Sequence, residues 1–108
     1  MQVEYESVSN AFVLRPVGDI NVQSSPELRK ILLEHYPGKG SIVVNLNQVR
    51  YMDSSGLATL IEGMQLARGG GGILILCEIR EQMLLDLLEI THLLDAFPIF
   101  DTEAQAVR

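Results

Sequence analysis

The side chains best suited to chemistry in this chain are the carboxylate and hydroxyl groups of the run Asp53-Ser54-Ser55-Gly56. The run follows an apolar segment and precedes an amphipathic one, so it lies where a strand would turn into a helix. Two interpretations fit it. Asp53 or Ser54 can simply cap the helix, with Gly56 making room for a tight entry. Alternatively, the exposed hydroxyl of Ser54 is a site of modification.

A hydroxyl in this position is well placed to act as a charge switch. Phosphorylation adds about −1.5 to −2 charges and three strong acceptors. The positive end of a helix dipole tolerates that charge, so the domain need not unfold. Beside Asp53 and the acidic second half of the chain, the same charge would still repel a docked partner. The run therefore fits a binding switch as well as a helix cap.

Other groups that could carry chemistry are poorly arranged for it. The glycines of 69–72 come between a helix and a strand, the reverse of a phosphate cradle. His35 and His92 are far in sequence from the single cysteine, Cys77, which gives neither a metal cluster nor a Cys-His nucleophile. No serine lies in a Gly-x-Ser-x-Gly elbow. We therefore expect no catalytic residue and no metal, and a buried packing role for Cys77.

Size and charge narrow the classes of function further. The 108 residues are 47% hydrophobic and 20% charged, which favours one domain that folds unaided over residues 1–108. The net charge of −6 disfavours nonspecific binding to nucleic acid or to an anionic membrane. No leader-like start or membrane-length apolar stretch is present, so we expect a cytoplasmic protein with no membrane insertion. Eight acidic against three basic residues in 54–108 favour a basic partner surface.

Strands are predicted where apolar and polar residues alternate, or where a short β-branched run is nearly continuous. The segments that fit are 3–6, 11–17, 41–46, 73–77 and 97–100. Pro16 is expected at a sheet edge or a strand end, and the pattern breaks at 18–21. A helix between 41–46 and 73–77 favours parallel pairing of these two strands. The expected sheet is mixed and has four to five strands.

Helices are predicted where apolar residues recur three and four positions apart between start and stop signals. Four helices are expected, starting at a serine cap in Ser24-Ser25 with Pro26 at the first helical position, at Asp53, near Met83 and at 101–103. With the sheet they define an α/β domain. The main core is expected to comprise Val43, Val44, Leu46, Leu57, Leu60, Ile61, Leu74, Leu76, Leu84 and Leu88.

The segment VVNLNQVRYMDSSGLATLIEGMQLAR resembles the anti-sigma factor antagonists of the STAS domain family. The shared pattern is a buried strand that ends in Asn-Leu, a short linker, Met-Asp-Ser-Ser-Gly-Leu and an amphipathic helix. The later stretches GGGGILILCEI and FPIFDTEAQAV resemble the remaining elements of the family, so the resemblance covers almost the whole chain. It implies a single STAS-like α/β domain.

The resemblance also implies a phosphorylation-controlled change of partner. The family's acceptor is the serine directly after the aspartate, which corresponds to Ser54, with Ser55 as the less favoured acceptor. The unphosphorylated chain would bind an anti-sigma factor that has serine kinase activity, and so release a sigma factor. Phosphorylation would end this complex and a phosphatase would restore it. The ATP site belongs to the kinase, so this chain is implied to need no cofactor and to be no enzyme.

We expect the partner to contact the strand-to-helix turn, the helix that follows it and the loop after the second strand. The residues concerned are Asp53, Ser54, Ser55, Gly56, Thr59, Glu62, Asp19 and Asn21.

Two positions depart from the family pattern. Asn21 stands where family members commonly have aspartate, and Thr91-His92 replaces a common Ser/Thr-Gly pair, which leaves the conformation of that turn open. A rival interpretation is a STAS subunit that binds a transporter component without phosphorylation. The serine after Asp53 argues against it. A small enzyme is a third class, for which no catalytic constellation is present.

Overall fold

Six strands and four helices make up the chain, which the computed structural model describes from residue 1 to residue 108. The strands are β1 (Gln2–Val8), β2 (Ala11–Ile20), β3 (Gly40–Asn45), β4 (Val49–Met52), β5 (Gly71–Cys77) and β6 (Ile99–Phe100). The helices are α1 (Ser25–His35), α2 (Ser54–Gly69), α3 (Gln82–Ile90) and α4 (Glu103–Ala106). None of the four helices combines the length and apolar character that a membrane crossing requires.

Five strands lie in one mixed sheet in the order β1-β2-β3-β5-β6. β1 and β2 form an antiparallel hairpin, whereas β2, β3, β5 and β6 are parallel to one another. Each parallel step along the chain passes through a helix, as parallel pairing requires. The predicted parallel pairing of 41–46 with 73–77 is confirmed, with Val44 opposite Leu76.

The sixth strand, β4, exceeds the predicted four to five strands. It pairs in parallel with the end of β2, with Gly18 opposite Val49 and Ile20 opposite Met52. The prediction that the second strand stops at Val17 was therefore wrong. Gly18 has a φ of 102° and the ladder is irregular there, which explains the break in the alternation.

Pro16 lies inside β2 rather than at a sheet edge or a strand end. β3 pairs with β2 only as far as Leu14, and the pairing with β4 begins at Gly18. Pro16 falls in the gap between these two partners, where its missing N–H removes no ladder hydrogen bond on that side.

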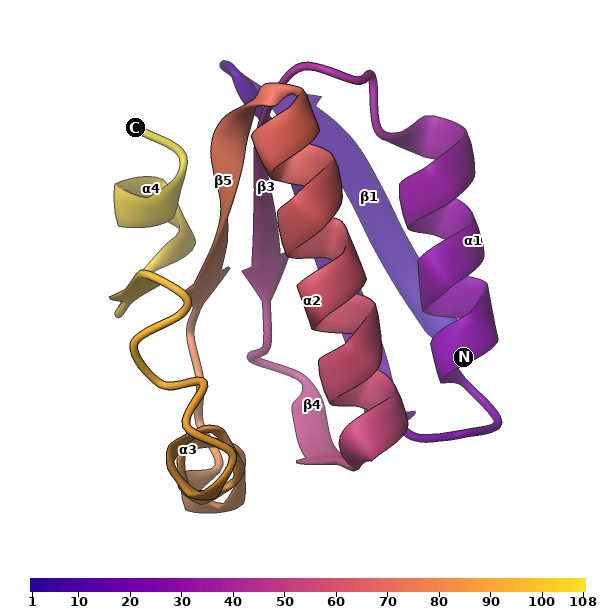
Figure 1. The fold of residues 1–108 in the computed structure, drawn as a ribbon, viewed down its shortest axis with the longest axis vertical. Coiled ribbons are helices and arrows are strands. Elements are labelled where there is room, and N and C mark those ends of the chain that lie inside the picture. The colour runs from indigo at the N-terminus through magenta and orange to yellow at the C-terminus, as the bar shows by residue number, and fades with distance from the viewer.

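The main core lies between one face of the sheet and the helices α1, α2 and α3. Figure 1 shows α1 and α2 side by side in front of the strands, with α3 near the end where α2 begins. Eight of the ten predicted core residues are buried in this layer: Val44, Leu46, Leu57, Leu60, Leu74, Leu76, Leu84 and Leu88. Ile61 is only partly buried against it, so the predicted burial of this residue was too strong.

A second, smaller core covers the opposite face of the sheet beneath α4. Its buried residues are Ala11, Val13, Val43, Ile75, Cys77 and Ala106. Val43 is thus buried as predicted but in the other layer, because successive strand residues point to opposite faces. The predicted packing role of Cys77 is confirmed, and burial raises the pKa of its thiol to about 12.

An ion-pair network fastens α4 to the sheet. The guanidinium group of Arg15 donates to both carboxylate oxygens of Glu103, each at 2.8 Å. The same group reaches Glu4 and Glu6 at 2.6 Å, and the amide of Asn45 donates to Glu103 at 3.1 Å. Fork-like pairing of this kind gives both geometric specificity and strength.

Three residues named in the sequence lie at or next to the ends of helices. Thr102 caps α4 in a capping box, as expected for the 101–103 run. His92 has a φ of 59°, so the turn that the sequence left open has the left-handed conformation that favours glycine. His35 is exposed and stacks on the ring of Tyr5, with 4.6 Å between ring centroids.

Candidate functional site

The first turn of α2 is capped by Asp53. The Oδ1 atom of Asp53 accepts the backbone N–H of Ser55 at 2.9 Å and that of Gly56 at 3.4 Å. These bonds satisfy two of the N–H groups that every helix leaves free at its start. The cap interpretation is therefore correct for Asp53, and the hydroxyl of Ser54 is not needed for it. We call residues 53–56 the acceptor turn.

Ser54 and Ser55 differ in accessibility. Ser54 is the first residue of α2 and its side chain is exposed, whereas Ser55 is half-buried with its N–H bound to Asp53. The free hydroxyl therefore belongs to Ser54. The positive end of the helix dipole is the place on a helix where an added negative charge is tolerated best.

Asp53 contributes a permanent negative charge beside this hydroxyl. Desolvation alone would raise the pKa of Asp53, but hydrogen bonds from Ser55 and from the N–H groups of Gly56 and Val22 lower it below its usual value. The carboxylate is consequently ionised at neutral pH.

Gly56 packs against β4 and β2. A Cβ atom at Gly56 would lie 2.4 Å from Cγ of Met52 and 3.0 Å from Cγ2 of Ile20. Glycine is therefore required for the close approach of the first turn of α2 to these strands. Gly56 is buried and offers no side chain, so its role is to position the acceptor turn. The expected contact of Gly56 with a partner stays a prediction.

Two other expected contact residues are engaged within the chain. Thr59 is only 4% exposed and its hydroxyl donates to the carbonyl of Ser55 at 3.1 Å, so the expectation of a surface role was wrong. The internal hydrogen bond is what allows a polar side chain to be buried there. Glu62 stays at the surface but pairs with Arg29 of α1 at 2.6 Å. It bridges the two helices.

The loop after β2 lies against the acceptor turn. The backbone N–H of Asp53 donates to the carbonyl of Ile20 at 3.2 Å. The structure thus brings the predicted loop residues Asp19 and Asn21 to the same end of the molecule as Ser54.

Asn21 holds this loop in shape. Its side-chain oxygen accepts the N–H groups of Gln23 at 2.9 Å and Ser24 at 3.1 Å. An amide oxygen can make these bonds as an aspartate would, so the departure from the family pattern preserves the turn. The Ser24 hydroxyl donates to the carbonyl of Asp19 at 2.7 Å. Ser24 precedes α1 but its side chain makes no capping hydrogen bond, and Ser25 is already the first residue of the helix, so the predicted serine cap was wrong.

Asp19 is exposed and lines an open hollow of about 420 Å³ at the end of the sheet. The other lining residues are Val17, Gly18, Asn47, Gln48, Arg50 and Glu81. The hollow is polar and carries two acidic groups and one basic group. The chain contains no group of three or more His, Cys, Asp or Glu side chains that could hold a metal ion.

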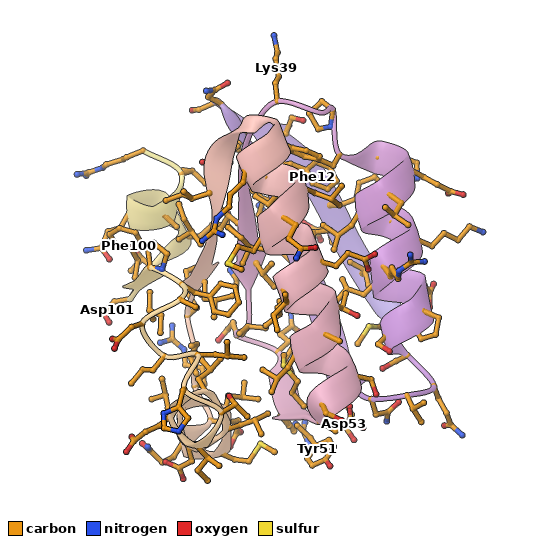
Figure 2. All side chains as sticks on the ribbon, viewed as in Figure 1. Phe12, Lys39, Tyr51, Asp53, Phe100 and Asp101 are labelled. Atoms are coloured by element: carbon orange, nitrogen blue, oxygen red, sulfur yellow. The ribbon has the colours of Figure 1, made fainter.

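Two exposed apolar residues beside the site were missed by sequence reasoning. Val22 is 71% exposed and Tyr51 is 44% exposed. Figure 2 shows Tyr51 next to Asp53 at the N-terminal end of α2. The one signal of an exposed apolar residue in the sequence was Val22, which is isolated in the polar run of 21–25.

The arrangement is an α/β domain with a mixed sheet, α1, α2 and α3 on one face, α4 on the other, and the acceptor turn after β4. The chain belongs to the STAS domain family, which matches residues 2–106. An anti-sigma F factor antagonist of Paenibacillus polymyxa is 27% identical over 99% of this chain and 92% of that relative. An anti-sigma-B factor antagonist of Bacillus subtilis (strain 168) is 30% identical over 92% of this chain and 90% of that relative.

Solved structures share the fold at lower identity. An anti-sigma factor antagonist from Mycobacterium paratuberculosis has a TM-score of 0.85 at 20% identity, over 98% of this chain and 90% of its own. The phosphorylated form of the Bacillus cell fate determinant SpoIIAA has a TM-score of 0.72 at 20% identity, over 98% and 96%. A sulfate transporter family protein from Wolinella succinogenes has a TM-score of 0.75 at 19% identity, over 94% of this chain and 86% of its own. The fold therefore occurs in both regulators and transport proteins.

Proposed function

We propose that this chain is an anti-sigma factor antagonist whose binding is controlled by phosphorylation of Ser54. The observation that carries the proposal is the exposed, uncommitted hydroxyl of Ser54 beside the Asp53 cap. The names of the two relatives support the class of partner. The unphosphorylated chain binds an anti-sigma factor with serine kinase activity and frees a sigma factor. Phosphorylation ends the complex, and a phosphatase restores it.

The physical basis is that the phosphate acts on the interface and leaves the fold intact. Ser54 is exposed and lies at the positive end of the α2 dipole, so an added charge costs the domain little. At a docked interface the same charge must lose its hydration next to the ionised Asp53. A mispaired charge in an interface typically costs about 2–5 kcal/mol, which is more than a tenfold loss of affinity.

Ser54 is favoured over Ser55 as the acceptor on accessibility and on charge. A kinase must surround the acceptor hydroxyl, and the side chain of Ser55 is half-buried behind the first turn of α2. Its N–H is also bound to the Asp53 carboxylate, so a phosphate on Ser55 would be added next to that carboxylate within a restricted space. The phosphoryl donor, ATP, is bound by the kinase.

The proposed role is that of a binding module in the cytoplasm. The chain supplies a surface and an acceptor, and the kinase and the phosphatase supply the chemistry. Its net charge of −6 suits a basic protein partner and disfavours nucleic acid and anionic membranes.

Phosphopeptide mapping tests the proposal. The purified chain is incubated with an anti-sigma factor kinase of the same organism and ATP, alongside the variants Ser54→Ala and Ser55→Ala. The expected result is one phosphate, located on Ser54, in the unaltered chain and in Ser55→Ala, and none in Ser54→Ala. Modification confined to Ser55 would refute the assignment. No modification, with recovery of a transporter component from cell extracts, would favour the transporter-type interpretation.

A further inference from the structure

We infer that the anti-sigma factor binds this chain through apolar contacts with Val22 and Tyr51 beside Ser54, and we call these two residues the apolar anchors. The inference rests on the proposed function and adds residues that determine affinity. The two side chains come from elements 29 positions apart in the sequence, the loop after β2 and the strand β4. The pairing of β2 with β4 brings both elements to the acceptor turn.

Both residues lie near Asp53. The backbone N–H of Asp53 donates to the carbonyl of Ile20, two residues before Val22, and Tyr51 lies two residues before Asp53 on β4. Figure 2 places the Tyr51 ring at the same end of α2 as Asp53. A partner that covers Ser54 can therefore also contact Val22 and Tyr51.

Val22 is displayed by a loop that is already ordered. Asn21 and Ser24 close this loop through four hydrogen bonds, from the N–H groups of Asn21, Gln23 and Ser24 and from the Ser24 hydroxyl. The side chain of Val22 nevertheless takes no part in packing and is 71% exposed. An apolar group held rigidly at the surface loses little conformational freedom on binding, which is a favourable property for an interface anchor.

Tyr51 has the residue type that dominates many interfaces. Tyrosine supplies a large, stiff contact area and a hydroxyl that can remain at the wet rim. With a 44% exposed side chain on a strand, it can bury further area without moving the backbone. Isolated exposed apolar residues are common on protein surfaces. Val22 and Tyr51 both lie near Asp53 and the Ser54 hydroxyl, and we treat them as one exposed apolar patch.

The charges around this patch specify the chemistry of its occupant. Asp19, Asp53 and Glu81 lie at this end of the molecule with two bases, Arg50 and Arg80, of which Arg80 bonds to Asn47 in the same hollow. Since the whole chain carries a net charge of −6, the complementary surface is an apolar pocket with lysine or arginine at its rim. A phosphate on Ser54 would then be forced against apolar contacts, and the loss of their dry packing would add to the effect of its charge.

The test is a calorimetric titration with the anti-sigma factor kinase that phosphorylates Ser54 in the mapping experiment. Val22→Ala and Tyr51→Ala are each expected to weaken binding about tenfold, with unchanged melting temperature, because an anchor truncation costs more than 1 kcal/mol. The matched control is Leu33→Ala. Leu33 is 47% exposed but lies in the last turn of α1, and α1 runs away from the start of α2 (Figure 1).

A second readout separates apolar anchoring from charge. The losses for Val22→Ala and Tyr51→Ala should stay the same between low and high salt, whereas the loss for Asp19→Asn should shrink as salt screens the rim. Unaltered affinity in both alanine variants, with tight binding by the unaltered chain, overturns the inference and leaves the proposed function standing. Equal losses in Leu33→Ala also overturn it. If the unaltered chain binds no anti-sigma factor, the proposed function fails and this inference fails with it.

Discussion

The Oδ1 atom of Asp53 accepts the backbone N–H of Ser55 at 2.9 Å, and so caps α2 without using the residue between them. In the proposed function, capping and phosphorylation are divided between adjacent residues. Asp53 satisfies the helix start, while Ser54 remains exposed and free to change its charge. This division explains how a domain can carry a phosphate at a helix terminus and keep its fold.

The first prediction concerns the cap itself. Asp53→Ala should lower the melting temperature by roughly 4–8 °C because it removes the acceptor for two helix N–H groups. Asp53→Asn should stay close to the unaltered chain, since asparagine caps as well as aspartate. Thermal melts followed by circular dichroism measure both. Equal melting temperatures for the alanine and asparagine variants would contradict the capping role.

The lowered pKa of Asp53 gives this comparison a pH dependence. A carboxyl group whose pKa is lower in the folded state stabilises the fold above its unfolded pKa, and this stabilisation is lost as the pH falls through the folded pKa. The unaltered chain should therefore lose the charge-dependent part of this stabilisation in acid. Asp53→Asn should not show this part of the decline.

A second prediction concerns the close packing of α2. Gly56→Ala should destabilise the domain by about 1–3 kcal/mol, because the new Cβ atom would overlap the buried side chain of Met52. Gly69→Ala is the matched control, since no atom lies within 4 Å of its added Cβ. That change should be neutral or stabilising by about 0.4–1 kcal/mol. Urea unfolding of both variants decides the point, and a neutral Gly56→Ala would mean that the helix entry can shift freely.

A third prediction follows from the pair that holds α4. The hydrogen bonds from Arg15 lower the pKa of Glu103 despite partial burial, and the amide of Asn45 lowers it further. Glu103→Gln should cost about 1–2 kcal/mol at pH 7, since it replaces charged hydrogen bonds by weaker neutral ones. Because the folded pKa is the lower one, the difference from the unaltered chain should vanish as the pH falls through it. A difference that persists in strong acid would point to packing instead of charge.

A fourth prediction tests the main core. Leu60 is 1% exposed on the buried face of α2, so Leu60→Ala should cost about 2–5 kcal/mol. Ile90 is 76% exposed, and Ile90→Ala should change stability by no more than about 0.5 kcal/mol. Chemical unfolding of the two variants provides the comparison. Similar losses in both would invalidate the assignment of the buried helix face.

The parts of the fold with strong local periodicity were predictable from sequence. The strands 41–46 and 73–77 and the faces of α2 and α3 follow patterns that depend on neighbouring residues only. β4 does not, because its sequence Val-Arg-Tyr-Met is buried at both ends and exposed in the middle. Its strand conformation comes from pairing with β2, which no short window of sequence contains.

The candidate site divides in the same way. The location of Ser54 at the start of a helix could be predicted, since a strand-to-helix turn and its cap are local features. The approach of the loop after β2 could not, because the bond from the N–H of Asp53 to Ile20 spans 33 positions and depends on the sheet. Burial of Thr59 was also out of reach, since its polarity is neutralised by a hydrogen bond inside the helix.

The central claim is that the charge on Ser54 controls binding and not folding. Its most direct test is a calorimetric titration of the unaltered chain, Ser54→Ala and Ser54→Asp against the anti-sigma factor, with thermal melts of all three in parallel. All three should melt alike, since Ser54 is exposed and Asp53 provides the cap. Ser54→Ala should bind like the unaltered chain, and Ser54→Asp should bind at least about tenfold more weakly, the cost of desolvating a mispaired charge. Equal affinities for the alanine and aspartate variants would contradict the claim and leave Ser54 without a regulatory role.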